Sequence, residues 1–116
     1  MNFDIEFYET ENGNCPVQEF IDSLDIKMQA KVVQMIEILA EKGNQLRMPY
    51  SECLGDGIFE LRCKQSNNIT RTLYFFYNDK IIIMTNGFTK KTQKTPLNEI
   101  KLAKSRRKEY LEKNKQ

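Results

Sequence analysis

The chain contains no histidine, and this absence limits its chemistry more than any other feature of its composition. Histidine is the usual general base near neutral pH and the commonest ligand of transition metals. Catalysis by a serine or cysteine nucleophile paired with histidine is therefore excluded, and a zinc site is not expected. The carboxylates form no cluster that predicts a metal site, so we expect neither a metal nor a cofactor.

Cysteines and long apolar runs are also scarce. Cys15, Cys53 and Cys63 are odd in number and scattered, so they predict neither a disulfide framework nor a CxxC metal pair. No apolar run approaches the roughly 20 residues that a membrane span needs. Residues 1–15 are acidic and lack the basic and apolar regions of a signal peptide. We therefore expect a cytoplasmic protein with no membrane partner.

Charge is present in quantity and is unevenly distributed. The 116 residues are 40% hydrophobic and 29% charged, which is typical of one globular domain over residues 1–116. Residues 1–60 hold four Lys/Arg and twelve Asp/Glu, a charge of −8, whereas residues 61–116 hold fourteen and four, a charge of +10; together these give the net +2. The basic second half indicates a polyanionic partner, with a merely solubilising basic face as the alternative.

The hydrophobic pattern predicts strand, helix, helix, three strands and helix, over residues 2–8, 16–24, 25–42, 58–64, 69–77, 80–88 and from Thr95 onward. Residues 43–57 are expected to be irregular because Pro49, Gly55 and Gly57 interrupt them. This order predicts an α+β fold. A small antiparallel sheet would carry an N-terminal helical hairpin, with a basic C-terminal helix and the helices mostly on one face. The sequence leaves open whether the first strand lies inside the sheet or at its edge.

The turn between the last two strands sets where the basic residues meet. If Asn78–Asp79 is a two-residue hairpin turn, Arg71 pairs with Asn86 and Ile69 pairs with Phe88. The chain that follows, "GFTKKTQKTP", then returns to the end of the sheet that holds Arg71.

This register predicts a cluster of cations from three strands. Arg62 and Lys64 share a strand face, and Arg71, Lys90 and Lys91 lie at the same end of the sheet. Like charges repel unless an anion lies between them, and an RNA phosphate would be such an anion. Guanidinium and ammonium groups suit phosphate oxygens and could support attack of a ribose 2′-hydroxyl without histidine. A solvated strand end is the alternative for each cation taken alone.

The aromatic residues of the strands could serve as base-stacking surfaces. Most of them are predicted to be core residues by strand parity; they are Phe59, Tyr74, Phe75, Phe76, Tyr77 and Phe88. Tyr74 and Tyr77 are expected on opposite faces of the sheet.

Four segments, "GIFELRCK", "ITRTLYFFY", "GFTKKTQKTP" and the closing basic helix, resemble the HigB-like, phage-derived branch of the RelE/ParE toxin superfamily. The resemblance covers nearly the whole chain. It implies the toxin of a type II toxin–antitoxin system, similar to mRNA interferases that cut message on the ribosome without a metal. The implied partners are a helix-turn-helix, HigA-like antitoxin and ribosome-bound mRNA, with DNA contacted only through the antitoxin.

The resemblance also implies roles for residues. The implied catalytic residues are Arg62, Arg71, Lys90 and Lys91. The implied RNA-binding residues are Lys64, Lys94, Lys104, Arg106 and Arg107. Asn86 stands where many members of the family have histidine. A ParE-like gyrase inhibitor and a non-catalytic phage accessory protein remain as alternatives, whereas a DNA-binding protein is disfavoured because the basic helix has no helix-turn-helix partner.

Overall fold

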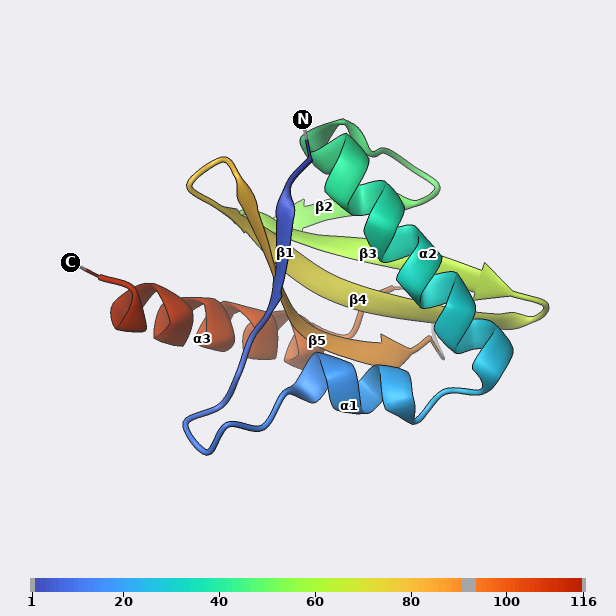
Figure 1. Ribbon diagram of the computed structural model, residues 1–116, viewed down its shortest axis with the longest axis horizontal. Coiled ribbons are helices and arrows are strands. Elements are labelled where there is room, and N and C mark those ends of the chain that lie inside the picture. Colours follow the sequence, from blue (N-terminus) through green and yellow to red (C-terminus); the bar gives the residue numbers. More distant parts are fainter. Residues whose placement is uncertain (1, 91–93, 116) are drawn as a thin grey trace.

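Five strands form one sheet in the order β1-β5-β4-β3-β2 (Figure 1). The computed structural model describes residues 2–90 and 94–115. The strands are β1 (Asp4–Phe7), β2 (Ser51–Gly55), β3 (Ile58–Gln65), β4 (Asn68–Tyr77) and β5 (Ile81–Thr89). The helices are α1 (Pro16–Asp22), α2 (Ile26–Lys42) and α3 (Leu97–Lys113), with a 3₁₀ turn at Gly43–Gln45. The α+β class is confirmed.

The sheet is mixed, so the expectation of an antiparallel sheet was wrong for β1. This strand lies at the edge and runs parallel to β5, with Phe7 beside Met84. The physical reason lies in the connections between the strands. Short turns join β2 to β3, β3 to β4 and β4 to β5, and such turns force antiparallel pairing. Two helices follow β1, and this longer connection permits a parallel return. β2 takes the outer edge of β3, which leaves the edge of β5 for β1.

Strand β2 itself was not expected, because the sequence predicted residues 43–57 to be irregular. It pairs with β3, with Ser51 opposite Leu61. Its polar, glycine-ended sequence has little strand propensity of its own, so pairing with β3 overrides the local pattern.

The β4–β5 register differs from the expected one by two features. The loop has three residues, since Tyr77 pairs with Ile81, and an irregularity between Leu73 and Tyr74 shifts the register by one more residue. Arg71 therefore lies opposite Phe88 instead of Asn86. The loop uses Asn78 at φ 55°, a backbone state that asparagine tolerates.

Helices lie on both faces of the sheet (Figure 1). One core joins α1 and α2 to one face, through residues such as Val32, Leu61 and Tyr74. A second core joins α3 to the other face, around Leu73 and Ala103. The N-terminal pair of helices is where the sequence predicted it, but α3 covers the face that the sequence left open.

Local signals explain where α2 begins and how α1 approaches the sheet. The Asp25 side chain accepts a hydrogen bond from the Met28 N–H at 2.8 Å and caps α2, which begins next to Asp25, close to the predicted start. Gly87 of β5 lies against the ring of Phe20, and a Cβ added there would come within 2.5 Å of Phe20 Cδ2. Within residues 2–90 and 94–115, no helix is long and apolar enough to cross a bilayer.

Candidate functional site

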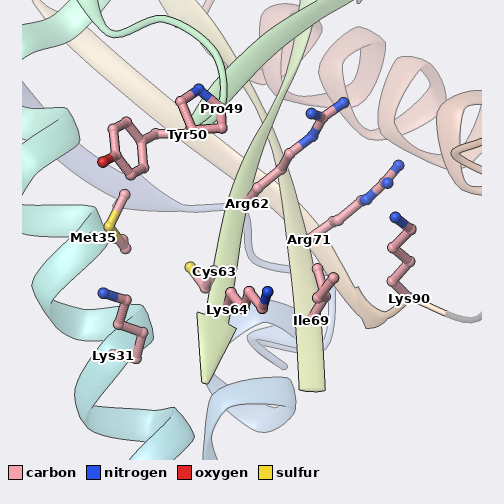
Figure 2. A pocket seen from close by; sticks show the side chains of 10 residues that line it. All are labelled: Lys31, Met35, Pro49, Tyr50, Arg62, Cys63, Lys64, Ile69, Arg71 and Lys90. Carbon is pink, nitrogen blue, oxygen red and sulfur yellow. The ribbon is translucent and has the colours of Figure 1, made fainter. Parts of the chain in front are cut away.

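A groove of about 330 Å³ opens beside the part of β3 that β2 does not cover (Figure 2). Five basic residues line it, from one helix and three strands or strand ends: Lys31, Arg62, Lys64, Arg71 and Lys90. The remaining lining residues are apolar or aromatic: Met35, Pro49, Tyr50, Cys63 and Ile69. The described lining therefore combines convergent positive charge with an apolar floor and contains no carboxylate.

The structure brings four of the sequence-predicted cations to this groove. Arg62 of β3 and Arg71 of β4 are direct pairing partners. The Lys90 N–H donates to the Ile69 carbonyl at 2.8 Å, which continues the β4–β5 ladder past the end of β5. The convergence that the register predicted therefore occurs, although the register itself was wrong. Lys91 lies outside the described residues.

A buried carboxylate, Glu60, joins the two arginines. Glu60 is 0% exposed and accepts hydrogen bonds from Arg62 Nε at 2.7 Å and from Arg71 Nη1 at 3.3 Å. The Thr95 hydroxyl donates to the same carboxylate and accepts from Arg71 Nη1 at 2.7 Å. Thr95 was predicted to cap α3, but Pro96 is the residue that precedes the helix. The Thr95 side chain instead fastens the chain before α3 to the two arginines.

Glu60 changes the electrostatic argument made from the sequence. Repulsion between Arg62 and Arg71 was expected to require a bound anion, and Glu60 supplies part of that negative charge from within the chain. The signal for this was present in "ELR": residues two apart on a strand share a face, so Glu60 had to point the same way as Arg62.

A second carboxylate, Glu52 of β2, binds Arg62 from the solvent side. Arg62 Nη2 donates to Glu52 Oε1, and the side chains are 25% and 39% exposed. Exposed ion pairs contribute only about 0–1 kcal/mol. An incoming phosphate could therefore displace Glu52 from Arg62 at little cost, whereas Glu60 is fixed by burial.

The predicted RNA-binding residues fall into two groups. Lys64 and Lys94 are exposed, and Lys64 lines the groove. Lys104, Arg106 and Arg107 of α3 instead contact the rest of the protein. Lys104 Nζ lies 2.8 Å from Asp56 Oδ2.

The two arginines of α3 make comparable contacts. Arg107 Nη1 donates to the Asp56 carbonyl. Arg106 donates to the Thr85 carbonyl at 2.9 Å and lies over the Tyr8 ring at 5.3 Å. The hydrogen bond from Lys104 lowers the pKa of the Asp56 carboxyl. These cations therefore help to hold α3 on the sheet, while Lys101 and Lys108 on the same helix are exposed.

Asn86, at the position where many HigB-like proteins have histidine, has a structural contact. It is 3% exposed, and its Nδ2 donates to Glu99 Oε1 at 2.9 Å. The Thr85 hydroxyl donates to Asn86 Oδ1 at 2.6 Å. Asn86 therefore holds the first turn of α3 and does not line the groove.

The aromatic residues considered for base stacking belong to the two cores. Tyr74 is 1% exposed and its hydroxyl is 2.6 Å from the Ser51 hydroxyl, whereas Tyr77 packs on Tyr110 from the other face. The opposite orientation of Tyr74 and Tyr77 is confirmed. Sequence reasoning missed Tyr50, which is 51% exposed at the groove, together with Lys31 on α2.

The carboxylates and thiols are the side chains that could bind a metal ion in a chain without histidine. Within the part of the chain that the structure describes, no three Cys, Asp or Glu side chains are grouped as metal ligands would be.

Comparison with known families shows which family the chain belongs to. The sequence model of the family described as phage derived protein Gp49-like (DUF891) matches residues 19–108, which run from α1 into α3 and include the whole groove lining. No curated protein matches the chain. The family is associated with the toxins of toxin–antitoxin modules. Since the match covers most of the chain, the protein belongs to the phage-derived Gp49-like family, a RelE/HigB-like toxin family.

Proposed function

We propose that the protein is a toxin that cuts mRNA on the ribosome without a metal ion. The groove carries this proposal, because five basic side chains and no acidic one line it. Single-stranded RNA presents a phosphate at every nucleotide, and a concave surface with convergent cations raises the local concentration of such a polyanion. The toxins associated with the family support the same assignment.

The proposed reaction is in-line attack of a ribose 2′-hydroxyl on the adjacent phosphorus. The bond from the 2′-oxygen to phosphorus forms as the bond to the 5′-oxygen breaks. The products are a 2′,3′-cyclic phosphate and a 5′-hydroxyl. The 2′-hydroxyl gives its proton to solvent water, and the departing 5′-oxygen gains one from a groove cation.

The groove residues would divide this work. Arg62 and Arg71 would neutralise the non-bridging phosphate oxygens, where charge develops during attack. Glu60 fixes both guanidinium groups before substrate arrives, so little reorganisation is needed. The Lys90 ammonium would stabilise charge and protonate the departing oxygen, and Lys91 stays in the proposed catalytic set on its sequence position alone.

Flanking phosphates would lie on the exposed lysines. Lys64 is exposed and lines the groove, and Lys94 is exposed and follows Lys90 in the sequence. Lys104, Arg106 and Arg107 would add to the basic field from α3. The proposed partners are ribosome-bound mRNA and a helix-turn-helix antitoxin, through which alone the module would contact DNA.

Substitution of Lys90 tests the proposal without removing Arg62, Arg71 or their contacts with Glu60. Lys90→Gln should slow ribosome-dependent cleavage of a defined mRNA by 100-fold or more, on the order of one general acid. Lys80→Gln is the matched control, because Lys80 is an exposed lysine in the β4–β5 loop and does not line the groove. Wild-type cleavage by Lys90→Gln would contradict the proposed role, and intact mRNA with the wild-type protein would contradict the nuclease assignment.

One observation favours a second function, a gyrase inhibitor or non-catalytic phage accessory protein. Both Arg62 and Arg71 bind carboxylates of the chain itself, as expected where the basic groove serves binding alone. A supercoiling assay with purified gyrase separates the two functions. Gyrase inhibition with intact mRNA would establish the second.

A further inference from the structure

Tyr50 stands apart from every other aromatic residue of the chain. The seven phenylalanines and five tyrosines all lie in the described residues, and Tyr50 alone among them is exposed, at 51%. Tyrosine is enriched at binding interfaces because its ring is apolar and its hydroxyl is polar, and this ring belongs to the lining of the groove.

The backbone of Tyr50 is held firmly although its side chain is exposed. Its carbonyl accepts the Arg62 N–H at 2.8 Å, and its own N–H donates to the Arg47 carbonyl at 3.0 Å. The next residue, Ser51, is buried and bonded to Tyr74. The backbone of Tyr50 is therefore held at a fixed place beside Arg62, so a ligand that binds here has to order only the side chain.

One side of the groove combines apolar and aromatic side chains with Lys31, and the other side is cationic. Figure 2 shows Tyr50 and Met35 on the α2 side of β3, and Arg71 and Lys90 on the other side. Arg62 lies on the strand between them. A simple anion would use the cations only, whereas a nucleotide carries both a phosphate and a flat apolar base.

We propose that Tyr50 is a stacking surface for one base of a single-stranded RNA whose adjacent phosphate lies on the groove cations. This inference rests on the proposed function, since it takes RNA as the ligand. Stacking on tyrosine tolerates any base, because every base has a flat π face. The phosphate contacts would then set the register of the strand, and Tyr50 would decide which nucleotide is held beside the scissile bond.

The test uses a short RNA that binds without being cut. A 2′-O-methyl oligonucleotide carries one 2-aminopurine, whose fluorescence falls when it stacks on an aromatic ring, and a second oligonucleotide has an abasic site there. Tyr50→Ala should weaken binding of the first by roughly 5- to 150-fold and abolish the quenching. Tyr50→Trp should keep both the binding of the first oligonucleotide and the quenching of its fluorescence. Binding of the abasic oligonucleotide should change less than about twofold in any Tyr50 variant.

Lys64→Ala provides the matched control for the phosphate contacts. It should weaken both oligonucleotides alike and reduce the salt dependence of binding by about one charge, whereas Tyr50→Ala leaves the salt dependence unchanged. If Tyr50→Ala binds and quenches like the wild type while Lys64→Ala is weakened, the stacking surface is refuted and the RNA site stands. If the wild-type protein binds neither oligonucleotide, the stacking surface is refuted, whereas the nuclease assignment is refuted by intact mRNA in the ribosome-dependent cleavage assay.

Discussion

Arg71 Nη1 lies 3.3 Å from Glu60 Oε1, and both side chains are almost completely buried, at 4% and 0% exposed. The pair joins β3 to β4 directly beneath the groove. Buried ion pairs tolerate the loss of one partner poorly, because the remaining charge is left without compensation. The groove therefore depends on Glu60 for its shape as well as for its charge.

Replacing Glu60 should lower the free energy of unfolding more than replacing an exposed acidic residue does. Glu60→Gln leaves Arg71 facing a neutral amide in a buried position, and we expect a loss of about 3–5 kcal/mol in the free energy of unfolding. Urea denaturation followed by circular dichroism measures it. Glu37→Gln, at an exposed position on α2, should change stability by less than about 0.5 kcal/mol.

Equal stability of these two variants would show that the Glu60–Arg71 contact has no energetic role. Such a result would also remove the argument that the arginines are fixed before substrate binds.

Removing the second carboxylate at the groove, Glu52, should strengthen the binding of RNA. Glu52→Gln releases Arg62 Nη2 from its exposed partner, so a phosphate no longer has to displace a competing anion. We expect severalfold tighter binding of single-stranded RNA, measured by fluorescence anisotropy at fixed salt. Glu37→Gln changes the net charge equally and should affect binding less, since it lies on α2 away from the groove lining. Equal tightening in both variants would mean that only net charge matters.

Much of the fold could be predicted because its signals are local. The start of α1 at Pro16 and the start of α2 next to Asp25 depend on neighbours within one helical turn, and both predicted starts are confirmed. Of the three meander strands, β3 was predicted from alternation, β4 from its β-branched and aromatic residues, and β5 from the turn signal before it, and none of these signals needs a partner to be visible. The β1 pairing could not be predicted, since it depends on which sheet edge remains open after β2 has paired.

The site was predictable in its cations and less so in its anions. The sequence indicated that Arg62, Arg71 and Lys90 converge, and they do line one groove. It gave no weight to Glu60, although strand parity with Arg62 was enough to place it. Tyr50 could not be identified from the sequence, because its exposure follows from pairing of the unexpected strand β2.

A methyl group added at Gly87 should destabilise the protein through one neighbour, Phe20. Its φ lies outside the left-handed region, so the backbone accepts alanine, but the Cβ would come within 2.5 Å of Phe20 Cδ2. We expect Gly87→Ala to cost about 1–3 kcal/mol of unfolding free energy through overpacking between α1 and β5. In a Phe20→Leu background the same change should cost less, and a double-mutant cycle measures the difference. An identical cost in both backgrounds would place the strain elsewhere.

Alkaline pH should destabilise the protein through Cys63. Burial raises the pKa of the Cys63 thiol from about 9 to about 11. The folded state thus holds this proton more tightly than the unfolded state. The stabilising contribution is complete below pH 9 and is lost as the pH rises through 11, at up to about 1.4 kcal/mol per pH unit between them.

Urea unfolding at pH 8 to 11 should show this decline in the free energy of unfolding, and Cys63→Ala should show a shallower decline. Cys53→Ala is the matched control, because Cys53 is exposed and should leave the slope unchanged. A Cys63→Ala slope equal to that of the wild type would assign the alkaline loss to other groups, such as Tyr74, whose pKa burial raises to about 12.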